Sequence, residues 1–232
     1  MTASQSPLPD GRTKVIACAT VIEEMLPLMD GNLDYEILDF GLHLVPNNLK
    51  QALQTAIDRT CQDYDTIILG YGLCSMAVVG LQARDCTLVV PKVDDCIAIF
   101  LGSGQAYNEQ ARKEPGTYYL TKGWIEVSDT LLDERRRTVE KYGEKKAEFI
   151  MSQMLRHYKR LVYIDTGTDN QPKYRAYAQE AAEQLKLRFE EVRGSHELVQ
   201  KMLFGPWDAD FVVAPPGHTI TYLDFKTTQS KE

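Results

Sequence analysis

The sequence predicts an α/β fold with mainly parallel sheets that are flanked by helices. Two patterns support this fold class: short apolar runs that are typical of buried parallel strands, and intervening segments with helical periodicity. Their regular alternation is typical of βα units. With 44% hydrophobic and 25% charged residues, the composition is that of an ordinary globular protein. We therefore expect one large core or two smaller ones.

Seven short runs are the predicted strands. They are 14–18, 35–40, 66–70, 87–90, 161–165, 188–192 and 211–214. Each is short, as strands enclosed by helices are. The first four form an N-terminal group and the last three form a C-terminal group.

Five segments have the spacing of apolar residues that predicts helices. They are 21–29, 48–61, 131–158, 173–187 and 195–203. The third is long and highly charged, and we expect it to break at Gly143. The Gly205-Pro206 pair ends the last helix.

The charged segment 131–158 separates the two groups of strands, as a crossover helix or as an arm. We favour two Rossmann-like lobes that face each other across a cleft over one continuous sheet. Five regions follow from this interpretation. They are a flexible tail at 1–12, an N-terminal α/β lobe at 13–127, a helical connection at 128–159, a C-terminal α/β lobe at 160–225 and a flexible tail at 226–232.

Charge and hydropathy narrow the range of partners and locations. The chain has 26 Lys and Arg against 33 Asp and Glu, a formal charge of −7, which argues against general binding to nucleic acid or anionic lipid. No apolar stretch approaches the roughly 20 residues that a membrane span needs. The first 12 residues lack the apolar core of a signal peptide. We therefore expect a cytoplasmic protein without a nucleic-acid or membrane partner.

Three of the five cysteines follow predicted strands. Cys18 ends the first strand, Cys74 follows the third and Cys96 follows the fourth, while His43 follows the second. The carboxyl ends of parallel strands open on one edge of a sheet, where open α/β sheets bind their ligands. We therefore expect these four residues to lie together.

Thiolate sulfur and imidazole nitrogen suit zinc, and thiolates also hold iron-sulfur clusters. Cys18, Cys74, Cys96 and His43 are the predicted metal ligands, although the close-spaced C-x-x-C signature is absent. The alternative is ordinary packing, because cysteine is commonly buried as a small apolar residue. Cys61 and Cys86 are assigned to packing, and an odd number of cysteines makes a disulfide framework an unexpected outcome.

A second hypothesis is a metal-free enzyme with Cys74 as its catalytic nucleophile, although the order of residues identifies no base for it. At the predicted metal site, His43 is either the fourth ligand or a nearby catalytic acid-base group. Cys74 follows a strand in a glycine-containing turn, where a helix N-terminus would lower the pKa of its thiol. Glycines and polar residues after other strands permit backbone amides to approach a ligand. The residues predicted to bind a small molecule are Gly72, Ser75, Asp165, Gly167, Thr168, Gly217 and His218.

Several segments together resemble the family catalogued as domain of unknown function 1638. They are 41–43, 69–74, 95–103, 115–124 and 215–217, and the resemblance covers roughly 15–220. The resemblance implies similarity to other members around Cys18, His43, Cys74 and Cys96. It also implies proximity to corrinoid-dependent methyl-transfer proteins in methane-producing archaea, and hence metal or one-carbon chemistry.

Three functions are compatible with these patterns. The first is a protein that binds an iron-sulfur cluster or zinc at a site of three cysteines and one histidine, and acts as an enzyme on a small molecule. The second is a non-catalytic binding or delivery partner of a corrinoid or methyl-transfer system, with an exposed apolar docking surface on 131–158. The third is the metal-free thiol enzyme. A homodimer is the base-rate expectation for a protein of this kind.

Overall fold

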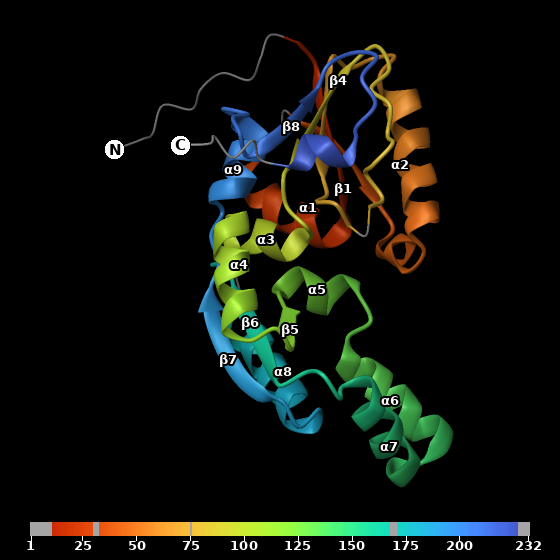
Figure 1. Cartoon of the computed structure of the whole chain (residues 1–232). Helices are drawn as coiled ribbons and strands as arrows, with labels where there is room; N and C mark the ends of the chain where they lie inside the picture. Colours follow the sequence, from red (N-terminus) through yellow and green to blue (C-terminus); the bar gives the residue numbers. More distant parts are fainter. Residues whose placement is uncertain (1–10, 30–32, 75, 168–170, 227–232) are drawn as a thin grey trace. The chain divides into compact units, whose positions relative to one another are not determined.

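The computed structural model describes residues 11–29, 33–74, 76–167 and 171–226. It confirms the α/β fold class, with two sheets of mostly parallel strands and helices packed against them (Figure 1). The chain divides into two compact units. Unit 1 contains Met1–Gly104 and His196–Glu232, and unit 2 contains Gln105–Ser195. Unit 2 is therefore a continuous segment inserted into the sequence of unit 1.

The sheet of unit 1 has five strands in the order β2-β1-β3-β4-β8. These strands are β1 (Thr13–Cys18), β2 (Asp34–Leu38), β3 (Thr66–Gly70), β4 (Thr87–Pro91) and β8 (Phe211–Ala214). The first four are parallel, and β8 pairs antiparallel with β4. Nearly every side chain of β1, β3 and β4 is buried, because these central strands are covered on both faces.

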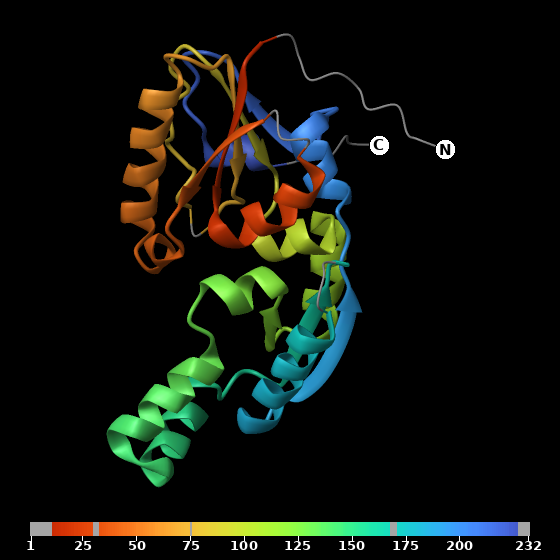
Figure 2. The same cartoon turned by 180° about the vertical axis from the view of Figure 1, so that it is seen from behind.

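Helices cover both faces of this sheet. They are α1 (Ala19–Met25), α2 (Pro46–Thr60), α3 (Cys96–Leu101) and α9 (Glu197–Phe204), with the short 3-10 helices η1 (Leu26–Leu28), η2 (Phe40–Leu44) and η3 (Tyr222–Phe225). The crossovers from β1 to β2 and from β2 to β3 run in opposite directions along the sheet. Right-handed connections therefore place α1 and α2 on opposite faces, as Figures 1 and 2 show. Helix α9 contacts β3, β4 and α1.

Helix α2 shows how the sequence forms these elements. Pro46 occupies the first turn, where its missing N–H is not needed. Leu49, Leu53 and Ile57 recur at helical spacing and are fully buried in unit 1. Each such Leu or Ile contributes roughly 1.5–3 kcal/mol of burial free energy relative to an exposed position. The helix is thus fixed by one apolar stripe.

Unit 2 has three parallel strands in the order β5-β6-β7. They are β5 (Thr117–Leu120), β6 (Arg160–Asp165) and β7 (Arg188–Arg193). The associated helices are α4 (Gly104–Lys113), α5 (Lys122–Val127), α6 (Leu131–Tyr142), α7 (Glu144–Met154) and α8 (Gln171–Gln184). Helix α8 contacts β6 and β7, and its alanines pack with Leu161 and Tyr163 in the main core of the unit.

The two units do not contain the same strands as the two lobes that the sequence predicted. The strand at 211–214 joins the first sheet rather than the C-terminal strands, and 117–120 joins the second sheet. The segment 131–158 does break at Gly143, but α6 and α7 pack within unit 2 instead of connecting two lobes. In the part of the chain that the structure describes, no helix is both long and apolar enough to cross a membrane.

Candidate functional site

The strand order of unit 1 reverses between β1 and β3. The chain leaves β1 toward β2 on one side and leaves β3 toward β4 on the other. Ala17 of β1 pairs with Gly70 of β3, so Cys18 and Tyr71 each follow directly at the carboxyl edge. Open α/β sheets bind ligands in the crevice outside the strand ends at such a reversal. Cys18 therefore lies at the position where this topology places a ligand.

The loops that carry Cys74 and Cys96 are held together by backbone hydrogen bonds. Leu73 N donates to Val93 O at 2.8 Å, and Cys74 N donates to Asp94 O at 2.9 Å. A Cβ atom on Gly72 would lie 2.6 Å from Val93 O, so only glycine permits this close approach. The glycine after β3 thus fixes the loop of Cys74 against the loop that leads to Cys96.

Helix starts position the other two cysteines. Asp95 caps α3 by accepting a hydrogen bond from Ile97 N at 2.9 Å, which makes Cys96 the first residue of that helix. Cys18 is the cap residue of α1, and its Sγ lies 3.0 Å from Thr20 Oγ1. Both thiols are buried, whereas Cys74 is half-buried.

Burial controls the ionisation of all three thiols. Desolvation, followed by the neighbouring Cys18, raises the pKa of Cys74 to about 12. Desolvation, followed by the nearby Cys18 and Cys74, raises the pKa of Cys96 well above its ordinary value. Burial also raises the pKa of Cys18, despite its hydrogen bond to Thr20. A helix N-terminus lowers the pKa of a thiol, but desolvation outweighs that effect here. The three thiols are therefore neutral at physiological pH and close enough to affect one another.

Two further polar groups line this region. The ring of His43 stacks between Phe40 and Tyr71, with centroid distances of 5.3 and 5.8 Å. Among the described residues, neither His43 Nε2 nor the Tyr71 hydroxyl has a hydrogen-bond partner, although both atoms are buried. Burial lowers the pKa of His43, so its imidazole is neutral, and burial raises the pKa of Tyr71. A buried polar atom without a hydrogen-bond partner costs free energy. His43 Nε2 and the Tyr71 hydroxyl are therefore both available to bind a ligand.

Tyr71 was not among the residues singled out from the sequence. Its only signal there is its position between two glycines at the exit of a buried strand. The backbone adds another unusual feature, because Cys74 and Met76 have φ values of +44° and +72°. Residues other than glycine rarely adopt this conformation, and strained backbone is common at functional sites.

Two of the predicted ligand-binding residues, Gly217 and His218, do not join this edge. Because β8 runs antiparallel to β4, Gly217 and His218 lie at the amino edge of the parallel strands. There Gly217 N donates to Ala83 O at 2.8 Å, and His218 Nε2 lies 3.1 Å from Asp224 Oδ2. The antiparallel direction of β8 therefore separates these two residues from the thiols.

Gly72 lies at the carboxyl edge, as described above, whereas Asp165 and Gly167 fall in unit 2. Asp165 ends β6, and its Oδ1 accepts a hydrogen bond from Gly167 N at 2.8 Å. Gly167 has a φ of +80°. Ser75 and Thr168 lie outside the described residues.

The donor atoms at the carboxyl edge fit a thiophilic metal by their chemistry. Three free thiols and the unpartnered Nε2 of His43 are the soft and borderline donors that zinc and iron-sulfur clusters use. As placed, however, the His, Cys, Asp and Glu side chains of the described residues form no group of three that could hold a metal ion. Coordination would therefore require these side chains to move closer together.

The two remaining cysteines correct one expectation. Cys61 caps the end of α2 and Cys86 directly precedes β4, and their sulfur atoms are joined in a disulfide. They were expected to be separate packing residues. The end of α2 and the start of β4 meet at the amino edge of the sheet and bring the two Cα atoms to 5.3 Å, a distance that sequence spacing cannot reveal.

These observations define the class: an α/β protein with an open, mainly parallel sheet whose carboxyl edge gathers free thiols. A family model described as "Protein of unknown function (DUF1638)" matches residues 37–203, and the chain belongs to this family. The resemblance noted in the sequence is thereby confirmed. The match includes His43, Cys74 and Cys96, whereas Cys18 precedes it. Comparisons with curated proteins and with solved structures gave no significant match.

Proposed function

We propose that unit 1 binds a thiophilic metal ion or an iron-sulfur cluster through Cys18, Cys74 and Cys96. His43 serves as a fourth ligand or as a neighbouring acid-base group. The observation that carries this proposal is the position of three free cysteines at the edge where the strand order reverses: Cys18 ends β1, and backbone hydrogen bonds hold the loop of Cys74 to the loop that leads to Cys96. This is the edge at which folds of this topology bind ligands.

Electrostatics favour a cation at this position. After burial, the groups that raise the pKa of Cys96 are Cys18, Cys74 and Asp95, all of which become negative when they ionise. A soft cation would compensate these charges and release the thiol protons, because metal binding is coupled to deprotonation of its ligands. Low intrinsic acidity is therefore compatible with metal binding, although metal affinity will rise with pH.

The two candidate groups imply different chemistry. A four-iron cluster held by three thiolates would leave one iron open to a small oxygenated or anionic substrate, whereas zinc held by three thiolates and His43 would be closed and structural. In either case the buried Tyr71 hydroxyl can donate a hydrogen bond to a group bound at this edge. Gly72 keeps the Cys74 loop close to the Cys96 loop.

The metal-free thiol enzyme has less support. A cysteine nucleophile reacts as the thiolate and needs a lowered pKa at neutral pH. Desolvation instead raises the pKa of Cys74 to about 12. The thiol is therefore in the wrong protonation state unless a cation lies beside it.

The binding or delivery partner remains a second candidate because of one observation. Helices α6 and α7 carry the exposed apolar side chains Tyr142, Phe149 and Met154. An exposed apolar surface on 131–158 is what docking to a corrinoid or methyl-transfer protein requires. This candidate predicts no turnover by the isolated protein.

We place this function in the cytoplasm, where thiols remain reduced. The three free cysteines fit a reducing compartment, whereas the Cys61–Cys86 disulfide is a bond that such a compartment disfavours. The proposed ligand is a small molecule and not nucleic acid or a membrane, because the formal charge is −7. The proposed assembly is a homodimer, which light scattering after size exclusion would measure.

Anaerobic purification followed by an absorption spectrum and elemental analysis for iron, zinc and cobalt tests the proposal. Stoichiometric iron with a brown colour supports the cluster, and zinc alone supports the closed site. The Cys74→Ser variant is expected to lose roughly ten-fold or more of the bound metal while keeping its circular dichroism spectrum. The matched control replaces both Cys61 and Cys86 by serine and is expected to retain metal. Metal-free wild-type protein, or full metal content in Cys74→Ser, contradicts the proposal.

A further inference from the structure

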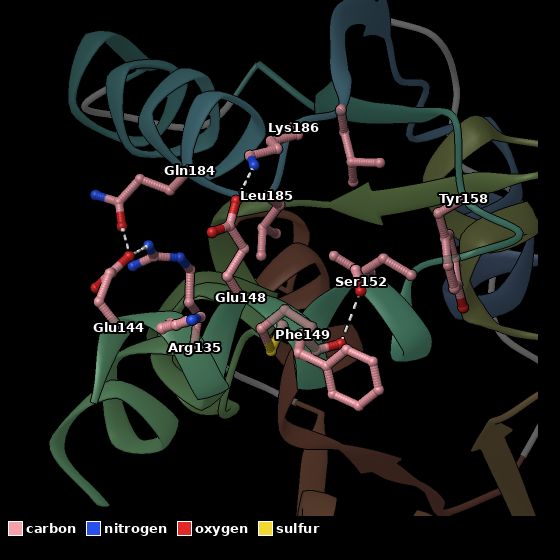
Figure 3. A pocket seen from close by; sticks show the side chains of 13 residues that line it. Arg135, Glu144, Glu148, Phe149, Ser152, Tyr158, Gln184, Leu185 and Lys186 are labelled. Carbon is pink, nitrogen blue, oxygen red and sulfur yellow. Dashed lines mark hydrogen bonds and ion pairs between the residues drawn. The ribbon is translucent and has the colours of Figure 1, made fainter. Parts of the chain in front are cut away.

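Unit 2 contains a cavity of about 630 Å³ that is lined by α6, α7 and the turn from α8 into β7 (Figure 3). This volume falls within the range of sites that bind small molecules. None of its residues belongs to the thiol site. The cavity is therefore a separate feature whose lining indicates what it could bind.

One side of the cavity is apolar. Met151, Leu155 and Leu185 form a small buried cluster at its base, apart from the main core of unit 2. The aromatic rings of Phe149 and Tyr158 also line it, although these residues are 64% and 40% exposed. Apolar surface left in water is unfavourable. A ligand that covered these rings would bury that surface over an apolar base that already exists.

The other side of the cavity is charged. Figure 3 shows Arg135, Glu144 and Gln184 on the side away from Phe149 and Tyr158. Arg135 pairs with Glu144, and Lys186 pairs with Glu148.

The charges of the lining do not balance. Three cations, Arg135, Lys145 and Lys186, face two carboxylates, Glu144 and Glu148. Within the described ranges, no ion pair engages Lys145. One positive charge of the cavity lining is thus left over.

Lys186 occupies a backbone position that usually belongs to glycine. Helix α8 ends with Lys186 N donating to Glu183 O at 3.1 Å and Leu187 N donating to Ala182 O at 2.8 Å. The residue at this position of such a helix end adopts a left-handed conformation, and Lys186 has a φ of +57°. Its ammonium group nevertheless reaches Glu148 on α7. A strained residue at the rim of a cavity is an observation from which a binding role can be inferred.

We propose that this cavity binds a small amphipathic molecule with an aromatic or branched aliphatic body and one anionic group, such as a carboxylate, sulfonate or phosphate. The body covers Phe149 and Tyr158 and packs on the Met151, Leu155 and Leu185 cluster. The anionic group neutralises the surplus positive charge near Lys145 and Lys186. Aromatic packing and charge-assisted hydrogen bonds supply affinity from the two ends.

Two fluorescent probes with similar aromatic bodies test both halves of this proposal. They are 8-anilinonaphthalene-1-sulfonate, which carries one negative charge, and the neutral N-phenyl-1-naphthylamine. We expect the full-length protein to bind the sulfonate probe at one saturable site and at least about ten-fold more tightly than the neutral probe. Phe149→Ala should weaken the binding of both probes by about ten-fold. Because Phe149 is largely exposed, this variant should fold normally.

Lys186→Gly separates ligand binding from stability. Glycine suits a φ of +57° better than lysine does, so this variant should unfold at a higher temperature. It should bind the sulfonate probe several-fold more weakly, with the neutral probe unaffected. Lys145→Ala should act on the sulfonate probe in the same way.

The matched controls are neighbours that do not line the cavity. Met154→Ala replaces an exposed apolar side chain of α7, and Lys146→Ala removes the charge next to Lys145. Both should bind the two probes as the wild type does. Unchanged sulfonate affinity in Phe149→Ala overturns the proposed site. Equal loss of both probes in Lys186→Gly overturns the recognition of an anionic group.

Discussion

The two edges of the unit 1 sheet differ in how their polar groups and cysteines are used. At the carboxyl edge, Cys18, Cys74 and Cys96 are free thiols, and His43 Nε2 and the Tyr71 hydroxyl have no partner among the described residues. The non-glycine residues Cys74 and Met76 adopt left-handed conformations at this edge. The carboxyl edge is thus rich in chemical groups that the fold itself does not use.

The amino edge is used to stabilise the fold. Cys61 and Cys86 form a disulfide there. Arg84 Nε donates to Asp58 at 2.7 Å, and Asp224 accepts hydrogen bonds from Thr221 and lies beside His218. The polar groups and cysteines of the amino edge are thus paired within the fold, whereas those of the carboxyl edge, where open α/β sheets bind their ligands, are left available.

The largest expected effect concerns the glycine that brings the two thiol loops together. We expect Gly72→Ala to destabilise the protein by about 3 kcal/mol, because the new Cβ would lie 2.6 Å from Val93 O and 2.9 Å from Asp95 N, both backbone atoms. The control at the amino edge is Gly217→Ala, where φ is +80° but no atom lies within 4 Å. Its cost should be about 1 kcal/mol. Urea unfolding measures both, and equal costs would contradict the close packing of these loops.

An effect of intermediate size is expected in the pH dependence of the free energy of unfolding, which differs between the two edges. Desolvation raises the pKa of the folded Cys74 from 9.0 to about 12. The corresponding contribution to stability is complete below pH 9, and it is lost as the pH rises toward 12. Between pH 9 and 10 the free energy of unfolding should fall by roughly 1 kcal/mol for this group. Urea unfolding at pH 8 and 10 measures the fall, and Cys74→Ala should reduce it.

The amino edge should respond at the opposite end of the pH scale. Burial opposes ionisation of Asp224, but hydrogen bonds from Thr221 and His218 outweigh it and lower the pKa. This contribution is present above the unfolded pKa of 3.8 and is lost as the pH falls below it. Asp224→Asn should reduce the fall in the free energy of unfolding at acidic pH and leave the fall at alkaline pH unchanged. A changed fall at alkaline pH in this variant would show that the two edges are coupled.

The smallest expected effect concerns Met76. Its φ of +72° favours glycine, and its side chain is 46% exposed. We expect Met76→Gly to raise the free energy of unfolding by about 0.5 kcal/mol, since relief of strain exceeds the added backbone entropy of the unfolded chain. Thermal unfolding measures this change. A lower melting temperature would instead show that the methionine side chain packs on the site.

Much of the fold follows from the sequence, and the exceptions have physical reasons. Buried runs such as Ile67, Ile68 and Leu69 identify their strands, and Gly143 marks the break between α6 and α7. Helix α3 was not predicted because all six of its residues are buried, so no apolar stripe reveals its period. The partner of β8 was not predicted because a four-residue strand carries no information about the distant segment it joins.

The candidate site was predicted to a similar extent. The rule that parallel strands end at one edge places Cys18 and the loop of Cys74 together without any coordinates. The same rule misplaced His218, because it assumed that β8 was parallel. The Cys61–Cys86 bond depends on distance between the end of α2 and the start of β4, which no local pattern encodes.

The insertion of unit 2 has a consequence for synthesis on the ribosome. Strands β1 to β4 emerge first, but β8, which covers the outer edge of β4, emerges only after all of unit 2. At about 5–20 residues per second, the nascent chain exposes the bare hydrogen-bonding groups of β4 for on the order of ten seconds. Unit 2 is continuous and can collapse during that interval, whereas the sheet of unit 1 must wait until β8 has emerged.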